Sequence, residues 1–319
     1  FAWKPFRAFL AASTALALVS IALYQGDLAR AEQVFFLKYL ISSQTAIMWM
    51  SALFFIATGA FCLGLAARSD FADATGSALT WCAVTMGTTG LMVRWYESYL
   101  IGADVGHIPL SNLYEVFVLF ALMTGLLYLY YEGRYATRRM GAFVLLVISA
   151  AVAFLLWYTF SREAQEIQPL IPALQSYWMK VHVPANFIGY GAFALAAMVG
   201  VADLLVRKGI LANRLPPAEV LDDVMYKAIA IGFAFFTIAT ILGALWAAEA
   251  WGTYWQWDPK ETWAFIVWLN YATWLHIRLT KGLRGPMLAW WAIAGLVVTA
   301  FAFVGVNMFL SGLHSYGSL

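Results

Sequence analysis

Long apolar runs separated by short polar connections make up most of the chain. A helix that crosses a bilayer needs about 20 mostly apolar residues. The apolar runs predict nine such helices, over 8–24, 45–66, 77–93, 113–131, 141–159, 184–206, 227–247, 263–279 and 287–309. The mixed segments 25–44 and 162–181 predict short interfacial helices. The pattern therefore predicts an all-α polytopic integral membrane protein with about nine transmembrane helices.

Composition supports this class and excludes others. Of the 319 residues, 63% are hydrophobic and 11% are charged, whereas a soluble domain carries about 25% charged residues. No soluble segment is long enough to fold alone, so 1–319 is expected to form a single membrane domain. The net charge of +2 without a basic patch argues against nucleic acid as a partner. Lys4 and Arg7 precede the first apolar run, which is long for a signal peptide and is interpreted as a membrane helix.

Lysine and arginine positions predict the orientation. Positively charged residues are enriched in cytoplasmic connections of membrane proteins. The N-terminal segment and every second connection after it carry 13 of the 19 Lys and Arg residues, and the opposite side carries 6. The N-terminus is thus predicted to be cytoplasmic and the C-terminus external. The connection between the predicted helices 227–247 and 263–279 is then external.

That external connection holds a dense aromatic stretch, Trp-Gly-Thr-Tyr-Trp-Gln-Trp-Asp-Pro-Lys-Glu-Thr-Trp, at 251–263. Large flat side chains suit a large flat ligand, although an interfacial aromatic belt is the alternative. Asp258, Pro259 and Glu261 fit the cap and first turn of a helix. Lys260 is expected to be a solvated surface lysine, with a contact to a ligand anion as the alternative.

The four histidines are the candidate metal ligands. His107, His182 and His314 lie on the predicted external side. His276 lies about 21 Å below the external end of its helix, at a rise of 1.5 Å per residue. An ionisable group at that depth is a functional candidate, and a histidine snorkelling beside Arg278 is the alternative. His107 is assigned no ligand role.

The aromatic stretch resembles the tryptophan-rich WWD signature of the haem-handling proteins of cytochrome c maturation, and its Tyr-Trp-x-Trp-Asp-Pro-Lys-Glu-Thr-Trp form resembles the CcsA (ResC-type) branch. Two further segments also match CcsA-type motifs: His-Val at 182–183, which leads a Gly- and Tyr-rich helix, and Gly-Leu-His-Ser-Tyr-Gly at 312–317. The resemblance covers nearly the whole chain and is most specific over 182–319. It divides the chain into 1–76, without a recognised motif, and 77–319, a CcsA-like core with the external segment 248–263.

The resemblance implies roles for individual residues. His182 and His314 would be the external axial ligands of haem iron, and His276 an inner, membrane-embedded haem ligand. The remaining haem-binding positions implied in this way are Trp251, Tyr254, Trp255, Trp257, Asp258 and Trp263. No other histidine lies within the predicted spans, so a second ligand at an inner site would have to come from a partner chain.

The resemblance also implies a function. A CcsA-type subunit of a system II cytochrome c synthase would export haem b to the outer face and attach it through thioether bonds to the Cys-x-x-Cys-His of apocytochrome c. A CcsB-type membrane subunit and thiol reductants are the implied partners. The expected location is the bacterial inner membrane with the active site on the external face, or the thylakoid membrane in a plastid. This chain has no Cys-x-x-Cys-His of its own.

Three other functions are alternatives. A CcmC- or CcmF-like haem carrier without synthase activity shares the aromatic signature. A dihaem b-type electron-transfer subunit needs two histidine pairs across the membrane, which three external histidines and one deep histidine do not provide. A non-haem secondary transporter predicts internal repeats and broken helices, and the sequence shows neither.

Overall fold

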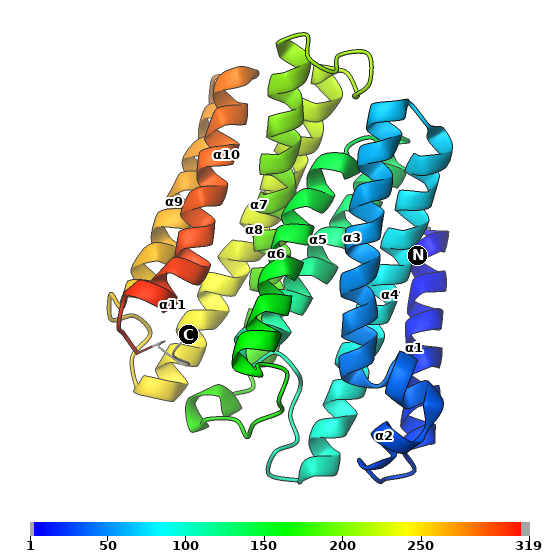
Figure 1. Ribbon diagram of the computed structural model, residues 1–319. Helices are drawn as coiled ribbons and strands as arrows, with labels where there is room; N and C mark the ends of the chain where they lie inside the picture. The colour runs from blue at the N-terminus through cyan, green and yellow to red at the C-terminus, as the bar shows by residue number, and fades with distance from the viewer. Residues whose placement is uncertain (1–2, 314–319) are drawn as a thin grey trace. The chain divides into compact units, whose positions relative to one another are not determined.

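The computed structural model describes residues 3–313. In that range the regular secondary structure is entirely helical, and no strand is present (Figure 1). His314 lies outside the described residues. The long helices are α1 (Lys4–Tyr24), α3 (Ser43–Ala67), α4 (Asp70–Ile101), α5 (Leu113–Tyr135), α6 (Gly141–Arg162), α7 (Met179–Arg207), α8 (Ala218–Trp251), α9 (Pro259–Thr280) and α10 (Pro286–Ala300). Each predicted span falls on one of them, and the last continues through η3 (Phe301–Gly305) and α11 (Val306–Phe309).

The predicted mixed segments do contain short helices: α2 (Arg30–Gln33) and η1 (Leu37–Ile41) in the first, and η2 (Pro172–Gln175) in the second. Seven of the helical runs are long and apolar enough to cross a membrane. The other two, α4 and α9, have the length but carry more polar side chains. The all-helical, multi-pass membrane character is confirmed, while the number of spans and their orientation stay predictions.

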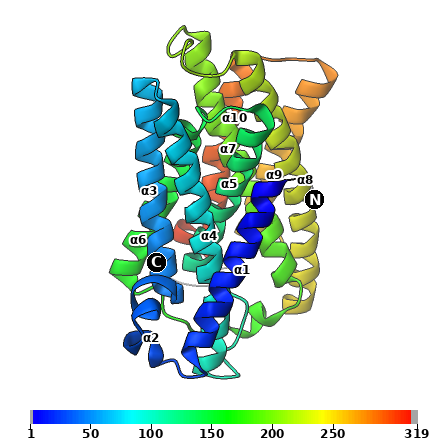
Figure 2. The same ribbon diagram turned by 90° about the vertical axis from the view of Figure 1, so that its right-hand side faces the viewer.

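Two compact units make up the chain, and their boundary falls within α5 and α6. The first contains residues up to Leu129 together with Ile148–Leu174, and the second contains Tyr130–Val147 and the chain from Gln175 onward. In the first unit α3 packs along α4, and α1 crosses α4 (Figure 2). In the second unit α7 packs against α8 and α10, and α9 packs against both of these helices.

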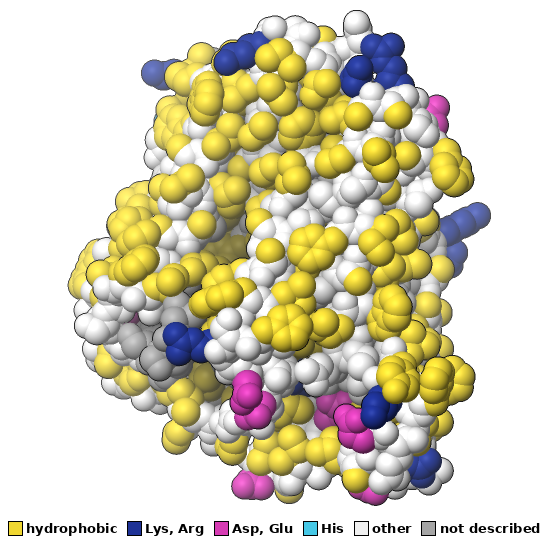
Figure 3. Space-filling model, in the orientation of Figure 1, with side chains coloured by type: hydrophobic (Ala, Val, Ile, Leu, Met, Phe, Trp, Pro, Cys, Tyr) yellow, Lys and Arg dark blue, Asp and Glu magenta, His cyan; other side chains and the backbone are white. Residues whose placement is uncertain are grey.

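Apolar side chains cover much of the molecular surface (Figure 3). Phe160 is 73% exposed, Val297 67% and Leu279 66%. A large exposed apolar surface is unfavourable in water but is expected of helices that face lipid. The Lys, Arg, Asp and Glu side chains in this view lie mainly towards the helix ends, as the cost of burying charge in a bilayer requires.

Candidate functional site

The second unit contains a cavity that brings a histidine and the aromatic stretch together. About 650 Å³ of empty space lies in and around this cavity, a volume that includes space open to the surroundings. Its lining comes from α7, α8, the loop between α8 and α9, the start of α9, and η3. The lining residues are His182, Asn186, Tyr190, Phe236, Thr240, Gly243, Ala244, Trp246, Tyr254, Trp255, Lys260, Glu261, Ala264 and Ala302.

Helical periodicity explains the α7 wall. His182, Asn186 and Tyr190 follow one another at intervals of four residues, and all three line the cavity. Residues four apart on an α-helix lie on one face. The helix begins at Met179, ahead of the predicted start at 184, so His182 lies within the first turns of α7 and not in the preceding loop. Its imidazole is therefore carried by a helix and not by a loop.

The His182 ring is fixed by its neighbours on α8. Its Nδ1 lies 2.7 Å from the carbonyl oxygen of Ala239. A carbonyl only accepts hydrogen bonds, so Nδ1 carries the proton and Nε2 keeps the lone pair that a metal ligand needs. The ring also stacks on Trp246, with 6.4 Å between centroids and 21° between planes. This is the hydrogen-bonding arrangement that orients metal-binding histidines in proteins.

The aromatic stretch is divided between the cavity and other contacts. Tyr254 and Trp255 line the cavity, whereas Trp251 packs on Trp246 with ring centroids 4.8 Å apart. The ring centroids of Trp263 and Phe301 lie 4.4 Å apart. Trp257 has a φ of 59° and is 65% exposed. The five aromatic residues of the stretch that were predicted to bind haem thus do not form one continuous stack.

Asp258 has the structural role that its position predicted. It caps α9 by accepting from the Lys260 amide at 2.9 Å, within a capping box completed by Glu261. Its other carboxylate oxygen accepts from the Leu313 amide at 2.7 Å. Leu313 directly precedes His314 in the sequence. One buried carboxylate therefore holds both the start of α9 and the described end of the chain.

Lys260 differs from expectation, since it lines the cavity and is half-buried. The prediction of a solvated surface lysine is wrong because the helical run after α10 covers the start of α9. The ammonium donates to Oδ1 of Asn307 in α11. Lys260 precedes the predicted span 263–279, and its burial lowers its pKa to about 8, with Asp258 acting in the opposite direction.

Several cavity residues were not predicted from the sequence. Trp246 of α8 lies outside the recognised motifs, whereas Asn186 and Tyr190 of α7 follow His182 within its motif and were assigned no role. The four-residue spacing of Asn186 and Tyr190 from His182 could have predicted that the three side chains share one helix face. Trp246 offered none, because a tryptophan near the end of a membrane helix is ordinary.

His276 does not line this cavity. It lies on an exposed face of α9, and no side-chain hydrogen bond to its imidazole is formed by residues 3–313. An exposed histidine in a predicted membrane helix fits a contact with another molecule.

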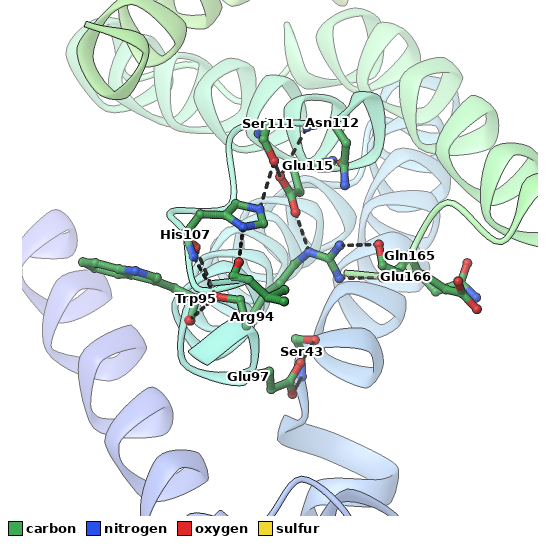
Figure 4. Close-up of polar contacts among 12 residues, drawn as sticks. Ser43, Arg94, Trp95, Glu97, His107, Ser111, Asn112, Glu115, Gln165 and Glu166 are labelled. Atoms are coloured by element: carbon green, nitrogen blue, oxygen red, sulfur yellow. Dashed lines mark hydrogen bonds and ion pairs between the residues drawn. The ribbon is translucent and has the colours of Figure 1, made fainter. Parts of the chain in front are cut away.

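A separate polar cluster in the first unit involves His107 and Arg94 (Figure 4). Arg94 forms a buried ion pair with Glu115, Nε to Oε1 at 2.8 Å, and donates to the carbonyls of Gln165 and Glu166. His107 bonds through Nδ1 to Val105 and through Nε2 to the Ser111 hydroxyl. The Arg94 guanidinium is therefore bound by groups of the protein itself, and both nitrogens of His107 are engaged in holding the loop.

The fold and the cavity define a polytopic helical membrane protein with an oriented imidazole beside a tryptophan-rich loop. Residues 110–314 match the family described as Cytochrome C assembly protein, and the chain belongs to that family, with relatives of the CcsA type. It is 40% identical over 232 residues to the cytochrome c biogenesis protein CcsA of Chlamydomonas reinhardtii, across 71% of this chain and 64% of that protein.

Two further comparisons show how much of each chain the similarity covers. The CcsA protein of Chlorella vulgaris is 35% identical over 294 residues, across 81% of this chain and 90% of the relative. A solved structure of the cytochrome c haem lyase CcmF matches with a TM-score of 0.64 at 18% identity, over 84% of this chain and 49% of that one. At this identity the second likeness concerns the fold alone. The chain spans just under two thirds of the algal relative first compared and about half of CcmF.

Proposed function

We propose that this protein is the CcsA-type subunit of a cytochrome c synthase and that the cavity beside His182 binds haem as substrate. The observation that carries the proposal is the fixed Nδ1–H to Ala239 hydrogen bond, since it leaves Nε2 as a ligand in a cavity shared with the aromatic stretch. Haem iron needs only one or two axial side chains from a protein. Tyr254 and Trp255 supply aromatic surface for the macrocycle.

His314 is proposed as the second axial ligand. The support is the Asp258 hydrogen bond to Leu313, which fixes the residue before it to the same loop that lines the cavity. Trp251, Trp257 and Trp263 are proposed to shape the loop and its surface around the haem edge. Asp258 acts on haem indirectly by holding the loop, the helix and the end of the described chain together.

The proposed reaction is addition of two cysteine thiols of apocytochrome c across the two haem vinyl groups. Each addition breaks an S–H bond, forms a C–S bond, and places the proton on the other vinyl carbon, so no net oxidant is consumed. The chain's contribution is to orient haem and to exclude competing ligands from the iron. A histidine from the Cys-x-x-Cys-His segment would replace one resident ligand.

We further propose that haem reaches this external site through the membrane and that His276 takes part in that passage. Its exposed position on α9 supports a site shared with a partner subunit of the CcsB type, which would supply the second ligand. The membrane would be the bacterial inner membrane or, in a plastid, the thylakoid membrane. Thiol reductants are expected as additional partners that keep the apocytochrome cysteines reduced.

Absorption spectroscopy of the purified protein with ferrous and ferric haem tests the site. The wild type is expected to show a six-coordinate low-spin spectrum, and His182→Ala, alone or with His314→Ala, is expected to show a high-spin spectrum or lose haem. His107→Gln is the matched control, since His107 lies in the other cluster. An unchanged low-spin spectrum in the double variant would rule out the proposed ligands. The absence of haem from every preparation would favour a transporter of another substrate.

Co-expression separates a synthase from a carrier. The chain and a CcsB-type subunit are expressed with an apocytochrome bearing Cys-x-x-Cys-His, without other maturation factors. Haem that stays bound to the cytochrome on denaturing gels indicates thioether formation and supports the synthase. Haem bound by the chain but never attached to the cytochrome would favour the carrier function of CcmC- and CcmF-like proteins.

A further inference from the structure

The cavity holds two hydrogen-bond donors whose capacity the protein does not use up. The Lys260 ammonium has three N–H donors, and its hydrogen-bond partner is the neutral Asn307 amide. None of the salt bridges within residues 3–313 includes Lys260. The buried Nε1–H of Trp255 has no acceptor in the same part of the chain. A buried donor without an acceptor is costly.

The neighbouring carboxylates do not fill this need, because they are committed to backbone amides. Glu261 accepts from the Gln256 and Asp258 amides at 2.7 and 3.2 Å. Asp258 accepts from Lys260 N and Leu313 N. The side of the cavity formed by Trp255 and Lys260 thus offers N–H donors and positive charge.

His182 lines the same cavity from α7. A ligand that places a metal at the imidazole and a carboxylate at the ammonium would satisfy both walls at once. Haem has this pattern, since its propionate side chains are carboxylates at the edge of the macrocycle. Charge-assisted hydrogen bonds to a carboxylate are stronger than neutral ones.

We infer that Lys260, with the Trp255 indole N–H, is the anchor for one haem propionate and sets the orientation of the macrocycle relative to His182. The inference rests on the proposed haem-binding function and goes further by assigning a positioning residue within it. Anchoring one carboxylate leaves the opposite, vinyl-bearing edge free to face the incoming thiols. Lys260 would therefore determine which edge of the ring is presented for reaction.

Titration of the purified full chain with haem and with haem dimethyl ester, whose propionates carry no charge, tests this assignment. The variants are Lys260→Met, which removes the charge at similar length, and Lys260→Arg, which keeps it. Lys281→Met, at the exposed far end of the same helix, is the matched control. Affinity is read from the absorption change, and spin state is read from the same spectra.

The wild type is expected to prefer haem over the ester by at least about tenfold, the lower end for a hydrogen bond to a charged group. Lys260→Met should remove the preference by weakening haem alone, and Lys260→Arg and Lys281→Met should retain it. Equal affinities in the wild type, or a preference that survives in Lys260→Met, would overturn the inference and leave the haem site intact. If Lys260→Met weakened binding of haem and of the dimethyl ester equally, Lys260 would have a structural role, and the inference would also be overturned. Failure of the wild type to bind either compound would reject the proposed function and this inference with it.

Discussion

At the residue scale, the geometry of His182 depends on the absence of a side chain opposite it. A Cβ placed on Gly243 would lie 2.9 Å from Cε1 and 3.1 Å from Nδ1 of His182. The imidazole would have to move, and the hydrogen bond to Ala239 would be strained. Gly243 is therefore part of the site, because the lack of a side chain there leaves room for the His182 imidazole.

Gly243→Ala is expected to weaken haem binding by up to about tenfold, the equivalent of one lost hydrogen bond of about 1.5 kcal/mol, and to shift the spectrum towards high spin. Haem titration and absorption spectra measure both effects. Gly59→Ala is the control, because a Cβ on Gly59 meets nothing within 4 Å. Equal haem affinities in the two variants would contradict the proposed orientation of His182.

The pH dependence of haem affinity provides another test of Lys260. Its lowered pKa of about 8 means that the charge is present below pH 8 and is lost as the pH rises through that value. Haem affinity of the wild type should therefore fall above pH 8, whereas Lys260→Arg should not show this fall, because arginine stays charged. The other titratable groups that line the cavity are His182, Tyr190, Tyr254 and Glu261. They remain in the variant, as does Asp258, which caps α9. Parallel pH profiles would contradict the prediction.

The sequence predicted some of these residues better than others. Asp258 was identified as a cap because capping depends on a few adjacent residues, and its hydrogen bonds confirm this. Lys260 was misjudged because its environment is created by η3 and α11, more than 40 positions later in the chain. Local patterns report local structure, whereas burial of a single side chain depends on which distant element covers it.

At the element scale, apolar run length predicted every long helix but not its ends. The α7 helix starts before Pro184, and α4 continues to Ile101, beyond its predicted end at 93. The π-helical turn η3 within the last run was not predicted, because it arises from packing. Ala302 of η3 lines the cavity, and π turns are frequent at functional sites.

The Arg94–Glu115 pair joins α4 and α5 to the loop after α6 in the first unit (Figure 4). The two side chains are 3% and 1% exposed, so removal of one partner leaves a buried charge. Arg94→Met is expected to lower the free energy of unfolding by about 3–5 kcal/mol, measured by thermal and denaturant unfolding in detergent.

A surface-pair control and a double variant accompany the Arg94→Met measurement. Lys38→Met, which breaks an exposed pair with Glu32 at 3.1 Å, should cost less than about 1 kcal/mol. Combining Arg94→Met with Glu115→Gln should cost less than the sum of the single changes, since the uncompensated charge is gone. Strict additivity would show that the pair does not act as a unit.

At the scale of the whole molecule, sidedness determines whether the proposed chemistry is possible. The cavity must lie on the side where apocytochrome c is found. The connections after α7 and after α9 lie at the same end of the second unit (Figure 1), and they contain Lys208, Arg214, Lys281 and Arg284. The loop before α9 lies at the other end (Figure 1), and Lys260 in the first turn of α9 lines the cavity. The positive-inside rule therefore predicts that the cavity lies on the external side.

Labelling of single cysteines in intact cells with a membrane-impermeant maleimide tests this orientation. Cys62 and Cys82 are exposed on the helices and are first replaced by serine. A cysteine at Gln168, in the loop after α6, is expected to react from outside. A cysteine at Ala212, between α7 and α8, is expected to react only after the membrane is permeabilised, because its connection carries Lys208 and Arg214. Both positions are exposed in the structure, so a difference in labelling reports the side of the membrane and not burial. The reverse pattern would place the cavity on the cytoplasmic side, where thioether formation on an exported cytochrome could not occur.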